Sequence, residues 1–198
     1  MFDPTDPVTI GRLIAETLLD QPRHALESIP RFYGAGVYAI YYNGSFQPYS
    51  PIKLTDHPIY IGKADPDDAE ATTPERQGDR LWLRLVKDHA KSISHVENLE
   101  LDDFECRYLV VKSRWQKTAE DYLIGKLKPV WNTEMKVCYG FSKHGDAATT
   151  RGNSRSPWDT LHPGRKWAWL AGNKDNRFSA QDITSRIGEH FRRHPPSQ

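Results

Sequence analysis

Two short segments rich in aromatic and β-branched residues constrain this chain more than any other feature. They are residues 36–42 (GVYAIYY) and residues 58–64 (PIYIGKA). A turn signal follows each, Asn-Gly at 43–44 and Asp-Pro at 65–66. Aromatic and β-branched residues between turn signals predict strands, so we expect the two segments to form a hairpin. Each contains a glycine near a tyrosine, and a strand glycine often marks a point where another group approaches the backbone closely.

Hydrophobic periodicity and helix-stop signals predict the remaining elements. Apolar residues at helical spacing predict helices over 8–27, 79–94, 115–127 and 180–193, and a third strand is expected over 104–111. The connection after the first strand, at 43–57, is too long for a tight turn. Residues 65–78 show no periodicity and are expected to form a loop.

The overall charge does not by itself indicate a nucleic-acid partner. The 198-residue chain carries 27 basic and 26 acidic residues, which gives a net charge of +1. A local basic patch is the feature that matters for such a partner, so a nucleic acid is not excluded.

The sequence lacks the features of an exported or membrane-bound protein. It contains no apolar run long enough to span a membrane, and its first residues are acidic rather than basic and apolar. The two cysteines, Cys106 and Cys138, lack the spacing of a metal or redox motif, and we expect both to be structural. We therefore expect a cytoplasmic protein that forms a single domain over residues 1–198.

Six polar side chains are placed so that they can meet at one face or edge of the expected sheet. They are Tyr38, Tyr60, Arg84, His89, Glu120 and Asn132. The carboxylate can bind a divalent cation, the guanidinium can stabilise charge on a transferring phosphoryl group, and a phenol or imidazole can take a proton from water. Together these groups suit phosphoryl transfer.

The two strands and this ordered set of residues resemble the GIY-YIG nuclease superfamily. The tripeptides at 36–38 (GVY) and 60–62 (YIG) are similar to the two that name it. The resemblance implies an α+β fold, in which helices flank a small three-stranded antiparallel sheet, with an N-terminal helix and a C-terminal extension added. It also implies that the superfamily's two tyrosines and its later arginine, glutamate and asparagine correspond to Tyr38, Tyr60, Arg84, Glu120 and Asn132.

Two further segments resemble the type II restriction endonuclease branch of this superfamily, which cuts palindromic, GC-rich DNA. They are residues 89–93 (HAKSI) and residues 156–165 (SPWDTLHPGR). The resemblance implies a catalytic core at 34–132, an N-terminal helical extension at 1–33 and a DNA-contacting extension at 133–198.

The basic residues near the core are candidates for contacts with DNA. Residues 131–177 contain more Lys and Arg than Asp and Glu, and arginine to guanine is the commonest specific base contact. The candidates are Lys63, Arg151, Arg155, His162 and Arg165.

The implied activity is site-specific hydrolysis of phosphodiester bonds in double-stranded DNA. One Mg²⁺ ion per active site, which Mn²⁺ could replace, would be held by Glu120, and Tyr38 would act as general base. His89 would either assist this base or hold the phosphate. The expected partners are double-stranded DNA and a second copy of the chain. A cognate DNA methyltransferase is expected in the same restriction system, without direct contact.

Two points stay open from the sequence. The helix at 79–94 offers both Arg80 and Arg84 as the catalytic arginine, and Arg84 is preferred because it leads directly into the segment of His89. The connection 43–58 is longer than in minimal members of the superfamily, and its role is open. Together with the N-terminal helix, it is our expected dimer surface.

Three other functions fit parts of the sequence. A homing or repair nuclease usually has a separate DNA-binding module, and no finger or helix-turn-helix motif is recognisable here. A catalytically silent DNA-binding module has no need of Glu120 together with both tyrosines. A small-molecule phosphoesterase would leave the basic, tryptophan-containing tail unexplained.

Overall fold

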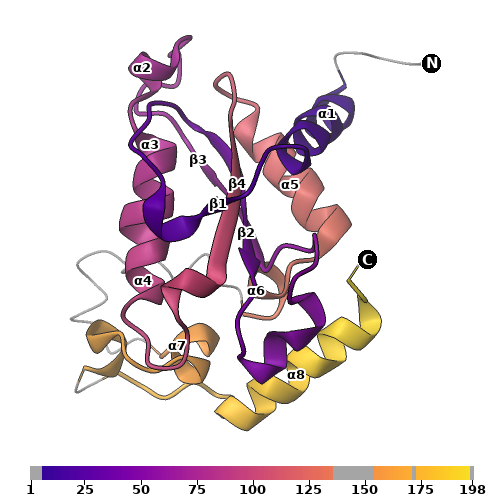
Figure 1. Ribbon diagram of the computed structural model, residues 1–198, viewed down its shortest axis with the longest axis vertical. Coiled ribbons are helices and arrows are strands. Elements are labelled where there is room, and N and C mark those ends of the chain that lie inside the picture. The colour runs from indigo at the N-terminus through magenta and orange to yellow at the C-terminus, as the bar shows by residue number, and fades with distance from the viewer. Residues whose placement is uncertain (1–5, 136–153, 171–172, 197–198) are drawn as a thin grey trace.

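The computed structural model describes residues 6–135, 154–170 and 173–196, and in these residues four strands form one antiparallel sheet (Figure 1). The spatial order of the strands is β1-β4-β2-β3. Their bounds are His24–Ala25 (β1), Gly36–Tyr42 (β2), Tyr60–Ala64 (β3) and Phe104–Val110 (β4). The predicted hairpin is β2 paired with β3, so β3 is an edge strand.

Helices cover both faces of the sheet. On one face lie α1 (Pro7–Leu19) and α5 (Gln116–Leu127), which pack against each other and against β2. On the other face lies a continuous helix over 80–93, made of α3 (Arg80–Trp82), the π-helical segment η3 (Leu83–Ala90) and α4 (Lys91–Ile93). The same face bears α6 (Val130–Thr133), α7 (Pro157–Leu161) and α8 (Ala180–Arg193). Short helical turns complete the described chain: α2 (Pro74–Gln77), η1 (Leu26–Ser28), η2 (Gln47–Ile52), η4 (Leu101–Asp103) and η7 (Lys166–Trp169).

Strand β2 is the centre of two hydrophobic cores. Its seven residues are all buried, and alternate side chains point to opposite faces of the sheet. Val37, Ala39 and Tyr41 pack in the core shared with α1 and α5. Tyr38 belongs to the larger core on the opposite face, together with residues of the C-terminal helices α7 and α8. The α+β fold expected from the resemblance is therefore confirmed.

The sheet has one strand more than expected, because the first helix is shorter than its periodicity predicts. That helix was expected over 8–27, but α1 ends at Leu19. Pro22, two residues before β1, lacks a backbone N–H and blocks continuation of the helix. The chain then runs along β4, where His24 pairs with Cys106. The expected loop at 65–78 similarly contains one helical turn, α2.

The long connection and the tail meet in a buried hydrogen-bond network. The hydroxyl of Tyr49, in η2, accepts a hydrogen bond from Trp131 Nε1 at 2.9 Å and lies 2.6 Å from His162 Nε2. The other ring nitrogen of His162 lies 2.9 Å from Asn98 Oδ1. These contacts join the connection, helix α6 and the tail into the main core.

Acid should destabilise this fold through its buried histidines. Burial lowers the pKa of His57 to about 4 and that of His162 to about 3, against about 6.5 in an unfolded chain. Because the folded pKa values lie below the unfolded ones, the unfolded state binds more protons as the pH falls below about 6.5. We expect the free energy of unfolding, measured by urea titration, to be fully present above that pH and to fall progressively toward pH 4.

The variant His57→Gln should show a shallower pH dependence than the wild type. His95→Gln, which changes an exposed histidine, is the matched control and should keep the wild-type slope. Equal slopes for His57→Gln and the wild type would contradict the assignment to buried histidines.

Candidate active site

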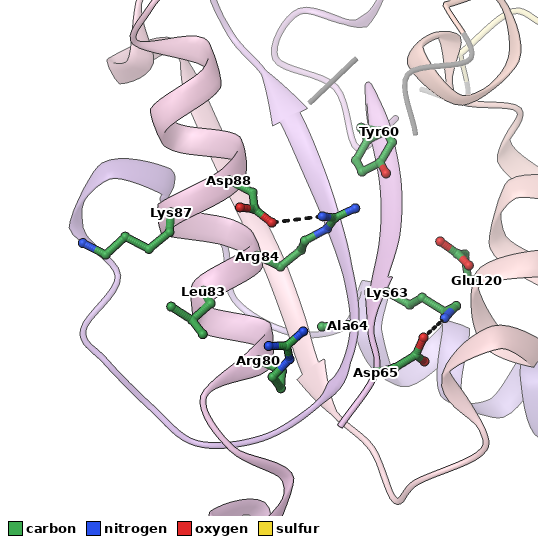
Figure 2. A pocket seen from close by; sticks show the side chains of 10 residues that line it. All are labelled: Tyr60, Lys63, Ala64, Asp65, Arg80, Leu83, Arg84, Lys87, Asp88 and Glu120. Carbon is green, nitrogen blue, oxygen red and sulfur yellow. Dashed lines mark hydrogen bonds and ion pairs between the residues drawn. The ribbon is translucent and has the colours of Figure 1, made fainter. Parts of the chain in front are cut away.

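A cavity of about 570 Å³ opens between helix 80–93, the edge strand β3 and helix α5 (Figure 2). Most of its lining side chains are polar or charged. They are Tyr60, Lys63, Ala64, Asp65, Arg80, Leu83, Arg84, Lys87, Asp88 and Glu120. The cavity thus brings together three of the six residues predicted from the sequence, one from each of the three elements.

Two tyrosines and a histidine form a cluster beside this cavity. The ring centroids of Tyr38 and Tyr60 lie 6.1 Å apart, and the ring of His89 lies 5.2 Å from each. The hydroxyl oxygen of Tyr38 is 2.5 Å from His89 Nε2, within hydrogen-bond distance. Tyr60 lines the cavity, whereas Tyr38 and His89 are fully buried. Tyr38 therefore packs beside Tyr60 and His89 without lining the cavity itself.

The π-helical segment explains how Arg84 and His89 can both act on Tyr38. They are five residues apart, and in an α-helix such residues point about 140° away from each other. Segment η3 instead has π-helical hydrogen bonding, in which residue i bonds with residue i+5. His89 is hydrogen-bonded to the Tyr38 hydroxyl, and the Arg84 guanidinium acts on the same hydroxyl by charge and hydrogen bonding.

Burial sets the protonation states of this cluster. Burial, and then the neighbouring Tyr60, raise the pKa of Tyr38 well above its ordinary value, and Arg84 opposes that shift. Burial, and then the positive charge of Arg84, lower the pKa of His89 well below its ordinary value. For Arg84 itself, burial acts to lower the pKa. Three neighbours raise this pKa overall: Tyr38, Asp88, which forms an ion pair with Arg84 at 2.9 Å, and Tyr60. At neutral pH the cluster is a neutral phenol, a neutral imidazole and a charged guanidinium.

Glu120 reaches the cavity from the opposite side of the edge strand. It lies on α5, one position from the buried Ala119, and faces the cavity that Tyr60 and Arg84 also line (Figure 2). Burial raises the pKa of Glu120, which the nearby Lys63 partly offsets. Among the described residues, the Glu120 carboxylate forms no hydrogen bond or ion pair. Burial thus penalises its anionic form, and a bound cation would relieve that penalty.

Glu120 and the cavity around it fit a divalent cation that has few protein ligands. In the described parts of the chain, no cluster of three or more His, Cys, Asp or Glu side chains could hold a metal ion. A site with Glu120 as its main protein ligand suits Mg²⁺, which keeps several waters and is commonly bound by one or two carboxylates plus substrate phosphates. A substrate phosphate in the cavity would supply the missing oxygen ligands.

Asn132 fixes the strand that bears Tyr60. Its Oδ1 accepts a hydrogen bond from the backbone N–H of Ile61 at 2.8 Å, and its Nδ2 donates one to the carbonyl of Ile61 at 2.8 Å. Asn132 thereby satisfies the free edge of β3 as a neighbouring strand would. It does not line the cavity. Ile61 lies between Tyr60 and Gly62, so the two hydrogen bonds hold the part of β3 that carries Tyr60. We therefore treat Asn132 as a positioning residue.

Of the two candidate arginines, the structure favours Arg84. The side chain of Arg80 is 47% exposed and pairs with Asp67 at 3.3 Å, on the loop after β3. The side chain of Arg84 is 29% exposed and acts on the Tyr38 hydroxyl. Asp88, which orients Arg84 through an ion pair, is not among the residues predicted from the sequence. Arg84 and Asp88 are four residues apart, which is a usual spacing for ion pairs along a helix, and this spacing could have indicated the role of Asp88.

The candidate DNA contacts fall into different environments. Lys63 lines the cavity and forms an ion pair with Asp65. Arg155 is largely covered, stacks on the ring of Trp169 at 3.6 Å and forms an ion pair with Asp175 at 2.5 Å. Arg151 lies outside the described residues.

The other two candidates, His162 and Arg165, are buried, and a DNA contact is not supported for them. Arg165 makes two hydrogen bonds to the Asp159 carboxylate, at 2.7 and 2.8 Å. His162 belongs to the network of Tyr49 and Asn98. Arg165 holds the tail against helix 80–93, because its guanidinium also lies 3.4 Å from Ser92 Oγ, whereas His162 holds the tail against η2 through Tyr49.

Comparison with known families identifies the class of this protein. The model of the Eco29kI GIY-YIG domain family matches residues 30–191. The chain therefore belongs to this family of GIY-YIG restriction endonucleases, as the resemblance predicted. A search of curated proteins found no match. Among the described residues, no helix is long and apolar enough to cross a membrane.

Replacing Asn132 by aspartate tests its positioning role. Asn132→Asp keeps the shape and the acceptor toward the Ile61 N–H, but it replaces the donor toward the Ile61 carbonyl by a second acceptor. We expect a loss of roughly 1–3 kcal/mol of stability and lower nuclease activity, because the strand bearing Tyr60 is loosened. Thermal unfolding and DNA cleavage measure the two effects. Full activity together with lowered stability would contradict a role in placing Tyr60.

Proposed function

We propose that the chain is a Mg²⁺-dependent type II restriction endonuclease, which hydrolyses phosphodiester bonds in double-stranded DNA at a palindromic, GC-rich site. The observation that supports this most directly is the convergence of Tyr60, Arg84 and Glu120 on one cavity in a member of a restriction endonuclease family. Cytoplasmic location in a bacterium follows from the same proposal.

Glu120 is the proposed metal ligand. One Mg²⁺ ion, which Mn²⁺ could replace, supplies Lewis-acid stabilisation of the scissile phosphate and the leaving oxygen when bound. Arg84 stabilises negative charge on the phosphoryl oxygens, because its guanidinium stays charged and its position is fixed by Asp88. Lys63, which lines the same cavity, adds positive charge beside Glu120.

The Tyr38–His89 pair is the proposed general base. Burial makes a free Tyr38 phenolate costly, so Tyr38 is a poor base alone. His89 is neutral, and its Nε2 lies 2.5 Å from the hydroxyl. The Tyr38 hydroxyl is buried in the free protein, so the proposal requires that DNA binding admits the attacking water to it. The hydroxyl oxygen then takes a proton from that water as its own proton passes to His89 Nε2, which leaves Tyr38 neutral and His89 protonated. Tyr60 lines the cavity and orients the water or the phosphate.

A palindromic site would place two copies of the chain about a two-fold axis, each copy cutting one strand. GC-rich recognition would use arginine contacts to guanine, for which Arg151 and Arg155 are the remaining candidates in the tail. A cognate methyltransferase would protect the host's own sites in the same system. We propose α1 and the connection 43–58 as the surface between the two copies.

Removing the charge of Glu120 should abolish cleavage and leave DNA binding largely intact. Glu120→Gln preserves shape but removes the anionic ligand, so plasmid DNA with Mg²⁺ should stay uncut while a gel-shift assay still detects binding. The neighbouring acid offers a matched control: Asp121 is exposed and pairs with Lys117 at 2.8 Å. Asp121→Asn should cut DNA as the wild type does, giving discrete fragments.

Cutting by Glu120→Gln at the wild-type rate would exclude Glu120 as the metal ligand. DNA binding by the wild type without any cutting would favour a silent DNA-binding module.

Single substitutions can distinguish the roles of the two tyrosines, Tyr38 and Tyr60. If the Tyr38–His89 pair transfers the proton, Tyr38→Phe and His89→Gln should each lower kcat at saturating DNA by about 10²–10⁴-fold. Tyr60→Phe should have a smaller effect, since Tyr60 only orients. The reverse order, with Tyr60→Phe inactive and Tyr38→Phe close to wild type, would assign the base to Tyr60. Thermal unfolding of each variant controls for loss of structure.

A further inference from the structure

A tryptophan near the cavity is flanked by two cations that the proposed chemistry does not use. Lys87 Nζ lies 5.3 Å from the ring centroid of Trp82, and the guanidinium carbon of Arg31 lies 5.8 Å from it. The indole Nε1 donates a hydrogen bond to the carbonyl of Ile29 at 3.1 Å, which fixes the ring. Lys87 also lines the active-site cavity, so this cluster is continuous with the site.

The two cations differ in the charge that they can offer a ligand. Arg31 forms an ion pair with Asp79 at 2.6 Å, but a guanidinium has five N–H donors, and some remain for another acceptor. Lys87 forms no ion pair in the described parts of the chain, and its side chain is exposed. It extends away from Arg84, toward the outer surface of the helix (Figure 2). Lys87 is thus the cation with the most unneutralised charge in this cluster.

We propose that Lys87, assisted by Arg31 and held in place by Trp82, binds a backbone phosphate of DNA beside the scissile one. This rests on the proposed function, because it takes the ligand to be DNA. Phosphates follow one another at about 3.4 Å of helix rise along each strand. A duplex that places one phosphate at Arg84 must therefore lay neighbouring phosphates along the adjoining surface. Contacts of this kind fix the register of the strand without reading its sequence.

The test is the salt dependence of binding to uncut DNA. Affinity is measured by fluorescence anisotropy on labelled duplexes of several sequences, in a Glu120→Gln background that leaves the DNA intact. Adding Lys87→Gln should weaken binding about fivefold to tenfold at ~0.1 M salt, equally for all sequences, and should reduce the slope of log affinity against log salt by about one. Arg31→Gln should act in the same direction but less strongly, because Asp79 already neutralises part of its charge.

Helix α5 offers a matched control, since Lys126 lies 6.0 Å from the ring of Tyr122 and does not line the cavity. Lys126→Gln should leave affinity and slope unchanged. An unchanged slope in Lys87→Gln, an equal loss in Lys126→Gln, or a loss confined to one sequence would each overturn the proposal. If the wild type binds DNA but never cuts it, the proposed function fails, while the same titration still decides whether Lys87 binds a phosphate.

Discussion

The pairing of Tyr38 with Gly62 across strands β2 and β3 is the contact on which the rest of the site depends. A Cβ atom at residue 62 would lie 2.4 Å from the Tyr38 hydroxyl oxygen, so only glycine lets the phenol lie across the neighbouring strand. That placement brings the hydroxyl to His89. It also fixes Tyr60, because a slip of one residue in the register would turn Tyr60 to the other face of the sheet.

The position of β3 at the edge of the sheet explains how residues from two faces share one cavity. Arg84 comes from the helix on one face, and Glu120 comes from α5 on the other. A further strand beyond β3 would separate them. An exposed edge also risks pairing with other chains, and the hydrogen bonds of Asn132 to Ile61 occupy part of it. The same amide therefore protects the edge and holds the strand that bears Tyr60, which is a role that its sequence position alone does not reveal.

The sequence predicted the elements that depend on local pattern and missed those that depend on distant partners. The first strand and the last helix have the expected bounds, 36–42 and 180–193. By contrast, β1 is only two residues long and forms because β4 is beside it, so no periodicity could predict it. The π-helical segment likewise leaves no periodic signal. A basic tail residue looks the same in sequence whether it meets DNA or a buried carboxylate, and only the fold places Arg165 against Asp159.

The electrostatics of the cavity explain why the proposed chemistry divides into two parts. Burial raises the pKa values of both Glu120 and Tyr38, so neither group is stabilised as an anion by the protein alone. For Glu120, which faces the cavity, a cation from solution can supply the missing charge. Tyr38 is buried, so its compensation must come from the fold, and the neutral His89 provides a proton acceptor there. The proposed mechanism therefore assigns charge neutralisation to the open side of the edge strand and proton transfer to the buried side, where burial keeps both Tyr38 and His89 neutral before the reaction.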